Sequence, residues 1–133
     1  MTTRNSRILV VDDQFGNRDT IEAYLQGEGY ITQSADSGKQ AFKLIAERLP
    51  DLIILDITMP GIDGYQVATL LKSNSETADI PIIMITGLTS RDARLVGLKA
   101  GAEDYLTKPL DPAELGLKVR NLLRLRANSK KSA

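Results

Sequence analysis

The sequence contains no cysteine, no histidine and no tryptophan among its 133 residues. Without cysteine the chain can form neither disulfides nor thiolate metal sites. Without histidine it lacks the commonest transition-metal ligand and the commonest general base. Any metal ion that this chain binds must therefore be held by oxygen atoms.

Long apolar runs and an excess of either charge are also missing. No segment approaches the ~18 apolar residues of a membrane helix, and no apolar signal-peptide core follows the first seven residues. Seventeen basic residues balance seventeen acidic ones, so no net field attracts nucleic acid or an anionic membrane. We expect a cytoplasmic protein with no membrane partner and no direct nucleic-acid partner.

The length of the sequence fits one domain, and its composition, with 42% hydrophobic and 26% charged residues, is ordinary for a globular protein. Five short apolar runs alternate with segments of helical period, which is typical of repeated βα units. The runs are Ile8–Val11, Tyr30–Ser34, Leu52–Leu55, Ile82–Ile85 and Tyr105–Leu106. Three of them are continuously apolar, as in central parallel strands covered by helices on both faces. The sequence therefore predicts an α/β fold.

Helix ends are marked by their own residues. Ser37 is a candidate N-cap, and Pro50 a candidate stop, for a helix with the apolar stripe Ala41, Leu44, Ile45 and Leu49. Gly101 suits the left-handed residue after a helix, and Asp111-Pro112 suits a helix start. We predict one domain over residues 7–126, an amino-terminal tail over 1–6, and a frayed tail or linker start over 127–133.

Polar residues follow the predicted strands at one end. Asp12 and Asp13 follow the first strand, Asp56 the third and Thr86 the fourth, while Lys108 comes after the fifth. Ligands of open parallel sheets bind at this carboxyl edge. Each residue taken alone is better explained as a helix cap, a turn residue or a solvated charge, and only their convergence favours a site.

Three carboxylates at one edge repel one another, and a cation relieves that repulsion. Oxygen ligands favour a hard ion such as Mg²⁺. An aspartate can accept a phosphoryl group covalently. Lys108 and Thr86 are candidates to stabilise the transferred charge, so the set predicts phosphoryl transfer to Asp56.

Four segments resemble the response-regulator receiver family of two-component signalling in order and spacing. They are Ile8–Gln14, Leu55–Gly64, Ile85–Gly87 and Gly101–Pro109, and the resemblance spans about residues 7–126. It implies a flavodoxin-like, doubly wound, five-stranded parallel sheet of (βα)5 topology with strand order 2-1-3-4-5. The domain would be a signalling module that promotes its own dephosphorylation and does not turn over an external substrate.

The same resemblance assigns roles to individual residues. Asp56 is the implied phosphoacceptor and Lys108 its phosphoryl partner. Asp12, Asp13, Asp56 and the Thr58 main-chain carbonyl are the implied Mg²⁺ ligands, and Thr86 and Tyr105 are the implied switch pair. Thr58 and Leu88 occupy positions that tune the dephosphorylation rate in the family, and Lys108-Pro109 resembles its cis-peptide site, although a trans turn is equally open from sequence.

Partners follow from the resemblance and from the absent histidine. A sensor histidine kinase or a histidine phosphotransfer protein must supply the phosphoryl group, docking on the first helix near Phe15–Arg18. The face of the fourth helix, fifth strand and fifth helix would bind an output domain or protein, or form a homodimer. Leu117, Leu123 and Leu125 either lie under neighbouring elements or contribute to that dimer. The domain could stand alone or begin a longer regulator.

Three other functions compete with this one. A haloacid-dehalogenase phosphatase needs a second aspartate two positions after the nucleophile, where this chain has Thr58. A flavin carrier needs a phosphate loop after the first strand, where Asp12 and Asp13 would repel phosphate. A receiver-like interaction module independent of phosphorylation remains the main alternative.

Overall fold

The computed structural model describes residues 5–57, 59, 61, 63–87, 95 and 99–132, with side chains as far as residue 128. The strands are β1 (Arg7–Val11), β2 (Ile31–Ala35), β3 (Leu52–Asp56), β4 (Ile82–Thr86) and β5 (Asp104–Thr107). The helices are α1 (Phe15–Gly27), α2 (Gly38–Glu47), α3 (Gly64–Lys72) and α5 (Pro112–Ser132). The predicted fourth helix falls mostly on residues 88–98, of which only 95 is described.

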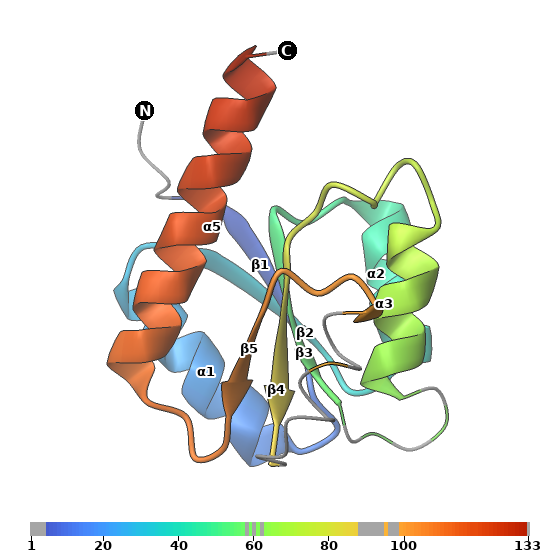
Figure 1. Cartoon of the computed structure of the whole chain (residues 1–133). Helices are drawn as coiled ribbons and strands as arrows, with labels where there is room; N and C mark the ends of the chain where they lie inside the picture. Colours follow the sequence, from blue (N-terminus) through green and yellow to red (C-terminus); the bar gives the residue numbers. More distant parts are fainter. Residues whose placement is uncertain are drawn as a thin grey trace.

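All five strands are parallel and lie in the order β2-β1-β3-β4-β5. Figure 1 shows α1 and α5 on one face of the sheet and α2 and α3 on the other. This is the predicted doubly wound sheet with the predicted strand order. Among the described residues, no helix combines the length and apolar character of a membrane span.

The continuous apolar runs are explained by two hydrophobic cores, one on each face. Successive side chains of a strand point to opposite faces, so alternate residues of β1, β3 and β4 pack into different layers. The layer with α2 and α3 contains Leu9, Val11, Ile53, Leu55, Ile82 and Met84. The layer with α1 and α5 contains Ile8, Val10, Leu52, Ile54, Ile83 and Ile85. Each side chain buried this way contributes about 1.5–3 kcal/mol of transfer free energy.

Two predicted helix starts are confirmed. The Gln40 amide donates to Ser37 Oγ at 3.1 Å at the start of α2. The Ala113 amide donates to Asp111 Oδ1 at 3.0 Å at the start of α5. Gly101 has a φ of +102°, as expected of the left-handed region.

Two helical predictions are corrected, and the structure shows which of three leucines in α5 are covered. Leu49 lies outside the α2 stripe and is 47% exposed, because α2 ends at Glu47 and Arg48 has an extended backbone. Leu123 is buried, whereas Leu117 and Leu125 are exposed. Residues 127–132 are helical rather than frayed, since no glycine or proline interrupts α5 between Leu117 and Ser132.

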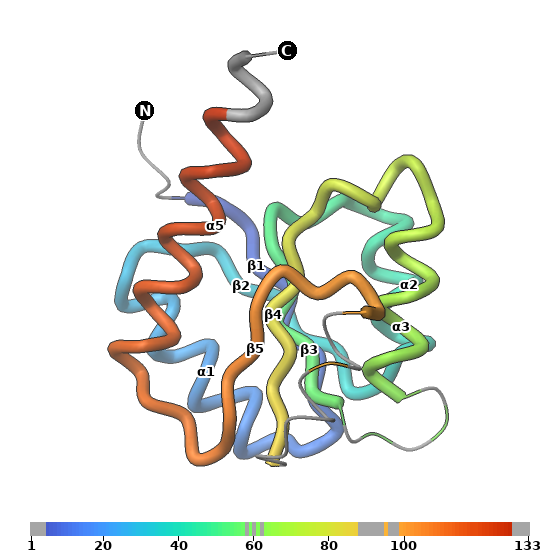
Figure 2. Tube along the Cα trace, in the orientation of Figure 1, coloured from blue at the N-terminus to red at the C-terminus, as the bar shows by residue number. Residues whose placement is uncertain are grey.

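Arg126 ties this long helix to the sheet at the end opposite the carboxyl edge, where α5 projects past the strands (Figure 2). Its Nη1 donates to the main-chain oxygen of Asp51 at 3.2 Å and to Asp51 Oδ1 at 3.1 Å. Asp51 Oδ2 in turn accepts from the Arg7 amide at 2.8 Å. One arginine thus joins α5 to the starts of β1 and β3.

We predict that Gly64→Ala lowers the free energy of unfolding by about 1–3 kcal/mol, because a methyl group there overpacks the interior. A Cβ on Gly64 would lie 2.5 Å from the Asp56 carbonyl oxygen and 2.7 Å from Ile57 Cα. Urea unfolding followed by circular dichroism measures the change. Gly16→Ala is the control, since nothing lies within 4 Å of its added Cβ. Equal stability of the two variants would refute the steric argument.

We predict that Arg126→Met lowers the free energy of unfolding by about 1–3 kcal/mol, because it removes charge-assisted hydrogen bonds. Amide hydrogen exchange should also accelerate in residues 127–132. Arg124→Met is the matched control on the same helix, where the lost side-chain bond to Asn121 is exposed. Unchanged exchange at the end of α5 in the Arg126 variant would contradict the assigned role.

Candidate functional site

Strand register brings the predicted site residues to one edge of the sheet. Val11 is opposite Leu55, so Asp12 and Asp13 follow β1 beside the end of β3 at Asp56. Thr86 ends β4 opposite Thr107 of β5. The next residue, Lys108, donates its amide to the Thr86 carbonyl at 2.8 Å. The convergence expected from the strand order is therefore present.

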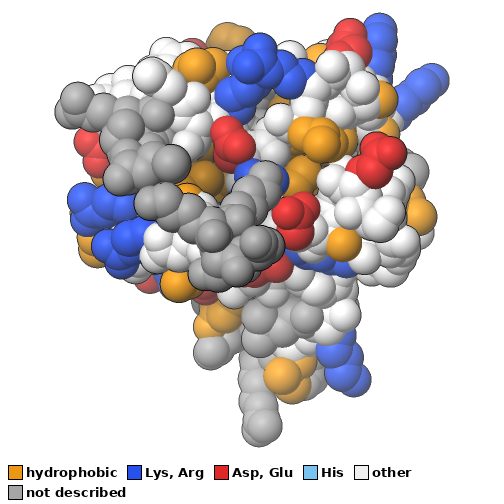
Figure 3. Space-filling model, turned by 90° about the horizontal axis from the view of Figure 1, so that it is seen from above, with side chains coloured by type: hydrophobic (Ala, Val, Ile, Leu, Met, Phe, Trp, Pro, Cys, Tyr) orange, Lys and Arg blue, Asp and Glu red, His pale blue; other side chains and the backbone are white. Residues whose placement is uncertain are grey.

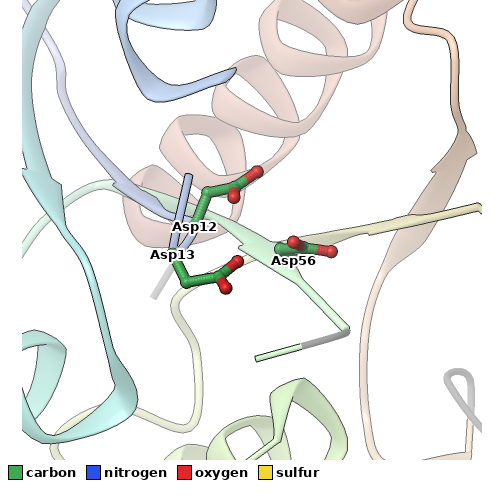
Figure 4. Close-up of side chains that lie close together, drawn as sticks. All are labelled: Asp12, Asp13 and Asp56. Atoms are coloured by element: carbon green, nitrogen blue, oxygen red, sulfur yellow. The ribbon is translucent and has the colours of Figure 1, made fainter. Parts of the chain in front are cut away.

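The acidic cluster consists of Asp12, Asp13 and Asp56. One carboxylate oxygen from each residue lies within 4.8 Å of the others. Figure 4 shows the three side chains close together, with Asp12 and Asp13 just after β1 and Asp56 at the end of β3. Asp12 and Asp56 are only 1% and 2% exposed, whereas Asp13 is open to solvent.

Asp12 is held by three hydrogen bonds that leave one oxygen available. Its amide donates to the Ala35 carbonyl at 3.1 Å, and its carbonyl accepts from Arg18 Nη1 at 2.7 Å. Its Oδ1 accepts from the Gln14 amide at 2.9 Å. Its Oδ2 is buried and has no hydrogen-bond partner among the described residues. A buried, unpaired carboxylate oxygen is costly unless a ligand satisfies it.

This donor set fits a hard divalent cation. All three side chains offer oxygen, which Mg²⁺ prefers, and the unpaired Asp12 Oδ2 is directed to no other described group. Mutual repulsion of the carboxylates would also fall on binding a cation. Thr58, the fourth implied ligand, lies outside the described residues, as does Leu88.

Lys108 places a cation beside Asp56. Its Nζ lies 3.3 Å from Asp56 Oδ2. The ammonium group follows β5 directly and is about one-third exposed, so it can respond to a change of charge on Asp56. The Lys108–Pro109 bond is cis, which decides between the two alternatives left open by the sequence.

The two predicted switch residues lie on neighbouring strands. Thr86 is 2% exposed at the end of β4, at the same edge as Asp56. Tyr105 of β5 is opposite Met84 of β4, and it is half-buried against the core layer that α2 and α3 cover. Thr86 therefore lies at the same edge of the sheet as the acidic cluster, and Tyr105 lies two residues before Thr107 on the same face of β5.

A pocket of about 240 Å³ opens beside the acidic cluster, between α1 and the loop from β5 to α5. Its walls include Asp12, Asn17, Thr20, Lys108 and Pro109. The site is thus accessible from the α1 side. Elsewhere on the surface, acidic and basic side chains are interspersed over the face shown in Figure 3.

Several features of the site were missed by sequence reasoning. Arg18 was assigned only to a docking helix, yet it bonds to the Asp12 main chain. Asp63 and Gln66 form a reciprocal capping box at the start of α3, just after the loop that follows Asp56. The Asp-x-x-Gln spacing could have revealed this box, whereas no local pattern predicts the Arg18 contact.

Comparisons with known proteins agree with this geometry. The family model described as the response regulator receiver domain matches residues 8–120. Response regulator PleD of Caulobacter vibrioides is 44% identical over 122 residues, covering 92% of this chain and 27% of PleD. The phosphate regulon transcriptional regulatory protein PhoB of Pseudomonas aeruginosa is 43% identical, covering 88% of this chain and 51% of PhoB.

A solved structure is similar over nearly the whole chain. The receiver domain of a signal transduction histidine kinase from Syntrophus aciditrophicus has a TM-score of 0.84 and 33% identity, covering 90% of each chain. This chain spans about a quarter to about half the length of the two curated relatives. The family match, the relatives and the sheet topology together show that the chain belongs to the response regulator receiver domain family of two-component systems.

Proposed function

We propose that this receiver domain is a phosphorylation switch whose acceptor is the Asp56 carboxylate. One observation carries the proposal: a nearly buried carboxylate lies within 4.8 Å of two others and 3.3 Å from a lysine ammonium. A nucleophilic carboxylate surrounded by groups that stabilise negative charge is what phosphoryl transfer to aspartate requires.

In the proposed transfer, an Asp56 carboxylate oxygen forms a bond to phosphorus as the bond from phosphorus to the donor's leaving atom breaks. The leaving group departs with that electron pair. The near-complete burial of Asp56 limits competing water at the acceptor. The reaction modifies the domain itself, so it serves as a signal rather than as turnover of an external substrate.

Mg²⁺ held by Asp12, Asp13, Asp56 and the Thr58 main-chain carbonyl would neutralise part of the charge on the transferred group. Asp12 would offer the otherwise unpaired Oδ2, while the Gln14 amide keeps Oδ1 in place. Lys108, which pairs with Asp56 before the transfer, would pair with a phosphoryl oxygen afterwards.

The switch itself would depend on Thr86 and Tyr105. A phosphoryl group adds about 1.5–2 negative charges and three acceptor oxygens, enough to draw a nearby hydroxyl toward it. We infer that the Thr86 hydroxyl donates to one of these oxygens and that the Tyr105 ring moves inward as Thr86 moves. The transfer would bias an equilibrium between two states that already exist.

The donor we propose is a sensor histidine kinase or a histidine phosphotransfer protein, because this chain has no histidine of its own. The pocket between α1 and the β5–α5 loop is the side from which such a donor could reach Asp56. The output would bind the face that includes β5 and α5, as a separate protein, a following domain or a second copy of this domain. Exposed Leu117 and Leu125 of α5 are candidates for that contact.

We predict that acetyl phosphate and Mg²⁺ together produce a covalent phosphoryl adduct, detected by intact-mass spectrometry. Asp56→Asn should abolish the adduct because the amide is not a nucleophile of this kind, and removal of Mg²⁺ should also abolish it. Asp36→Asn is the matched control, since Asp36 is an exposed aspartate directly after β2 at the same edge of the sheet. A wild-type protein that forms no adduct, and shows no spectral change with beryllofluoride, would favour a phosphorylation-independent interaction module.

A second prediction separates acceptance of the phosphoryl group from the response to it. Thr86→Ala should still form the adduct with Asp56, because the nucleophile and acidic cluster are intact. The Tyr105 ring resonances should then shift on phosphorylation in the wild type but not in the variant, which ring-labelled NMR measures. Thr107→Ala, on the neighbouring strand, is the control. If the Tyr105 resonances of Thr86→Ala shift on phosphorylation as much as those of the wild type, coupling of Tyr105 to the site through the Thr86 hydroxyl is excluded.

A further inference from the structure

Arg18 is a cationic side chain beside the acidic cluster to which the proposed transfer assigns no role. It lies in the first turn of α1, where its amide donates to the Gln14 carbonyl at 3.2 Å. Its guanidinium reaches back across the loop and donates from Nη1 to the Asp12 carbonyl at 2.7 Å. The contact is partly buried, which strengthens a charge-assisted hydrogen bond.

The atom that Arg18 contacts gives this bond its significance. The Asp12 carbonyl belongs to the peptide unit that links Asp12 to Asp13, and a peptide unit is planar. The orientation of this plane is set by ψ of Asp12 and φ of Asp13, the two backbone torsions that relate one aspartate to the other. A single hydrogen bond to the carbonyl therefore restrains two of the three carboxylates at once.

The other contacts of Asp12 restrain different parts of the residue. The bond to Ala35 holds its amide, and the bond from the Gln14 amide holds one carboxylate oxygen. Among the described residues, Arg18 provides the one side-chain donor recorded for the Asp12 carbonyl. Without Arg18, the described contacts of Asp12 would be those of its amide and its carboxylate, and none would involve its carbonyl.

The guanidinium is itself held in place. Its central carbon lies 5.7 Å from the centre of the Phe15 ring, within the range of a cation–π contact. Phe15 is 71% exposed, so its ring gains little from burial, and its recorded partner in the structure is this guanidinium. This contact favours the orientation of Arg18 that reaches the Asp12 carbonyl.

We propose that Arg18 is a positioning residue for the metal site, which acts by fixing the Asp12–Asp13 peptide plane and hence the spacing of both carboxylates. This inference rests on the proposed function, because it presumes that the acidic cluster binds Mg²⁺. Groups that orient metal ligands from outside the ligand set commonly change metal affinity when they are removed.

An electrostatic role and a positioning role for Arg18 predict opposite changes in the affinity for Mg²⁺ when the side chain is removed. Removing a cation close to three carboxylates makes the local potential more negative, which by charge alone would tighten Mg²⁺ binding. Loss of the hydrogen bond would let the peptide plane rotate and would weaken binding. The direction of the change in affinity therefore distinguishes the two roles.

The test is an NMR titration of the ¹⁵N-labelled chain with MgCl₂, for the wild type and for Arg18→Met. We expect the Kd for Mg²⁺ to rise by about tenfold in the variant, the lower end of the usual effect of such groups. The Gln14 amide, which donates to Asp12 Oδ1, should already shift in the metal-free variant. If Arg18→Met does not fold, Arg18→Gln is titrated in its place, and the same rise in the Kd for Mg²⁺ is expected.

Arg120→Met is the matched control, because it removes the same charge from an exposed position on α5. Its Kd should equal that of the wild type. Binding by the Arg18 variant that is as tight as the wild type, or tighter, overturns the positioning role while leaving the proposed function intact. A wild type that does not bind Mg²⁺ overturns both.

Discussion

Mutual repulsion among three carboxylates is the constraint around which the functional edge of this domain is built. Asp12 and Asp56 are almost fully buried, and one oxygen from each lies within 4.8 Å of Asp13 as well. Like charges this close in a poorly hydrated place oppose folding. The opposing groups are near at hand: the Lys108 ammonium faces Asp56, and the Gln14 amide and Arg18 guanidinium both bond to Asp12. Each of these groups offsets part of the repulsion.

The sheet makes that arrangement possible because its strands pack the core through their middle residues and present the functional side chains at their ends. Inside β1, β3 and β4, alternate apolar residues fill two core layers and hold the strands in register. At the strand ends, polar residues take the place of the apolar ones, although Asp12, Asp56 and Thr86 remain buried. The register of Val11 with Leu55 is what places the aspartates of β1 beside the aspartate of β3. A slip by one residue would move the carboxylates apart and turn each core residue to the wrong face.

The features that sequence reasoning predicted are those determined by local patterns. Continuous apolar runs predicted central strands, Ser37 and Asp111 predicted helix starts, and the carboxyl-edge rule predicted which residues would meet. The errors arose where tertiary contacts decide. Leu49 keeps the helical spacing of its neighbours, but the backbone at Arg48 has already left the helix.

The end of α5 and the support of Asp12 illustrate the same limit. Residues 127–132 are small and polar, which favours a tail, yet they continue a helix whose anchor is Arg126 on Asp51, 75 residues away in sequence. The close approach of Gly64 to the Asp56 carbonyl and the contact of Arg18 with the Asp12 carbonyl are nearer in sequence, but they too depend on how the chain folds around the strand ends. No spacing in the sequence encodes such contacts.

Strand β3 has an ion pair at or next to each of its ends, and both cations come from the same stretch of chain. At its carboxyl end Asp56 faces Lys108, and before its first residue Asp51 binds Arg126. The two cations bracket the loop after β5 and most of α5. The core strand β3 is therefore joined by charge to the β5–α5 loop region at one end and to α5 at the other. A change of charge on Asp56 would act directly on the Lys108 ion pair, whereas the Arg126 ion pair at the other end of β3 does not include Asp56.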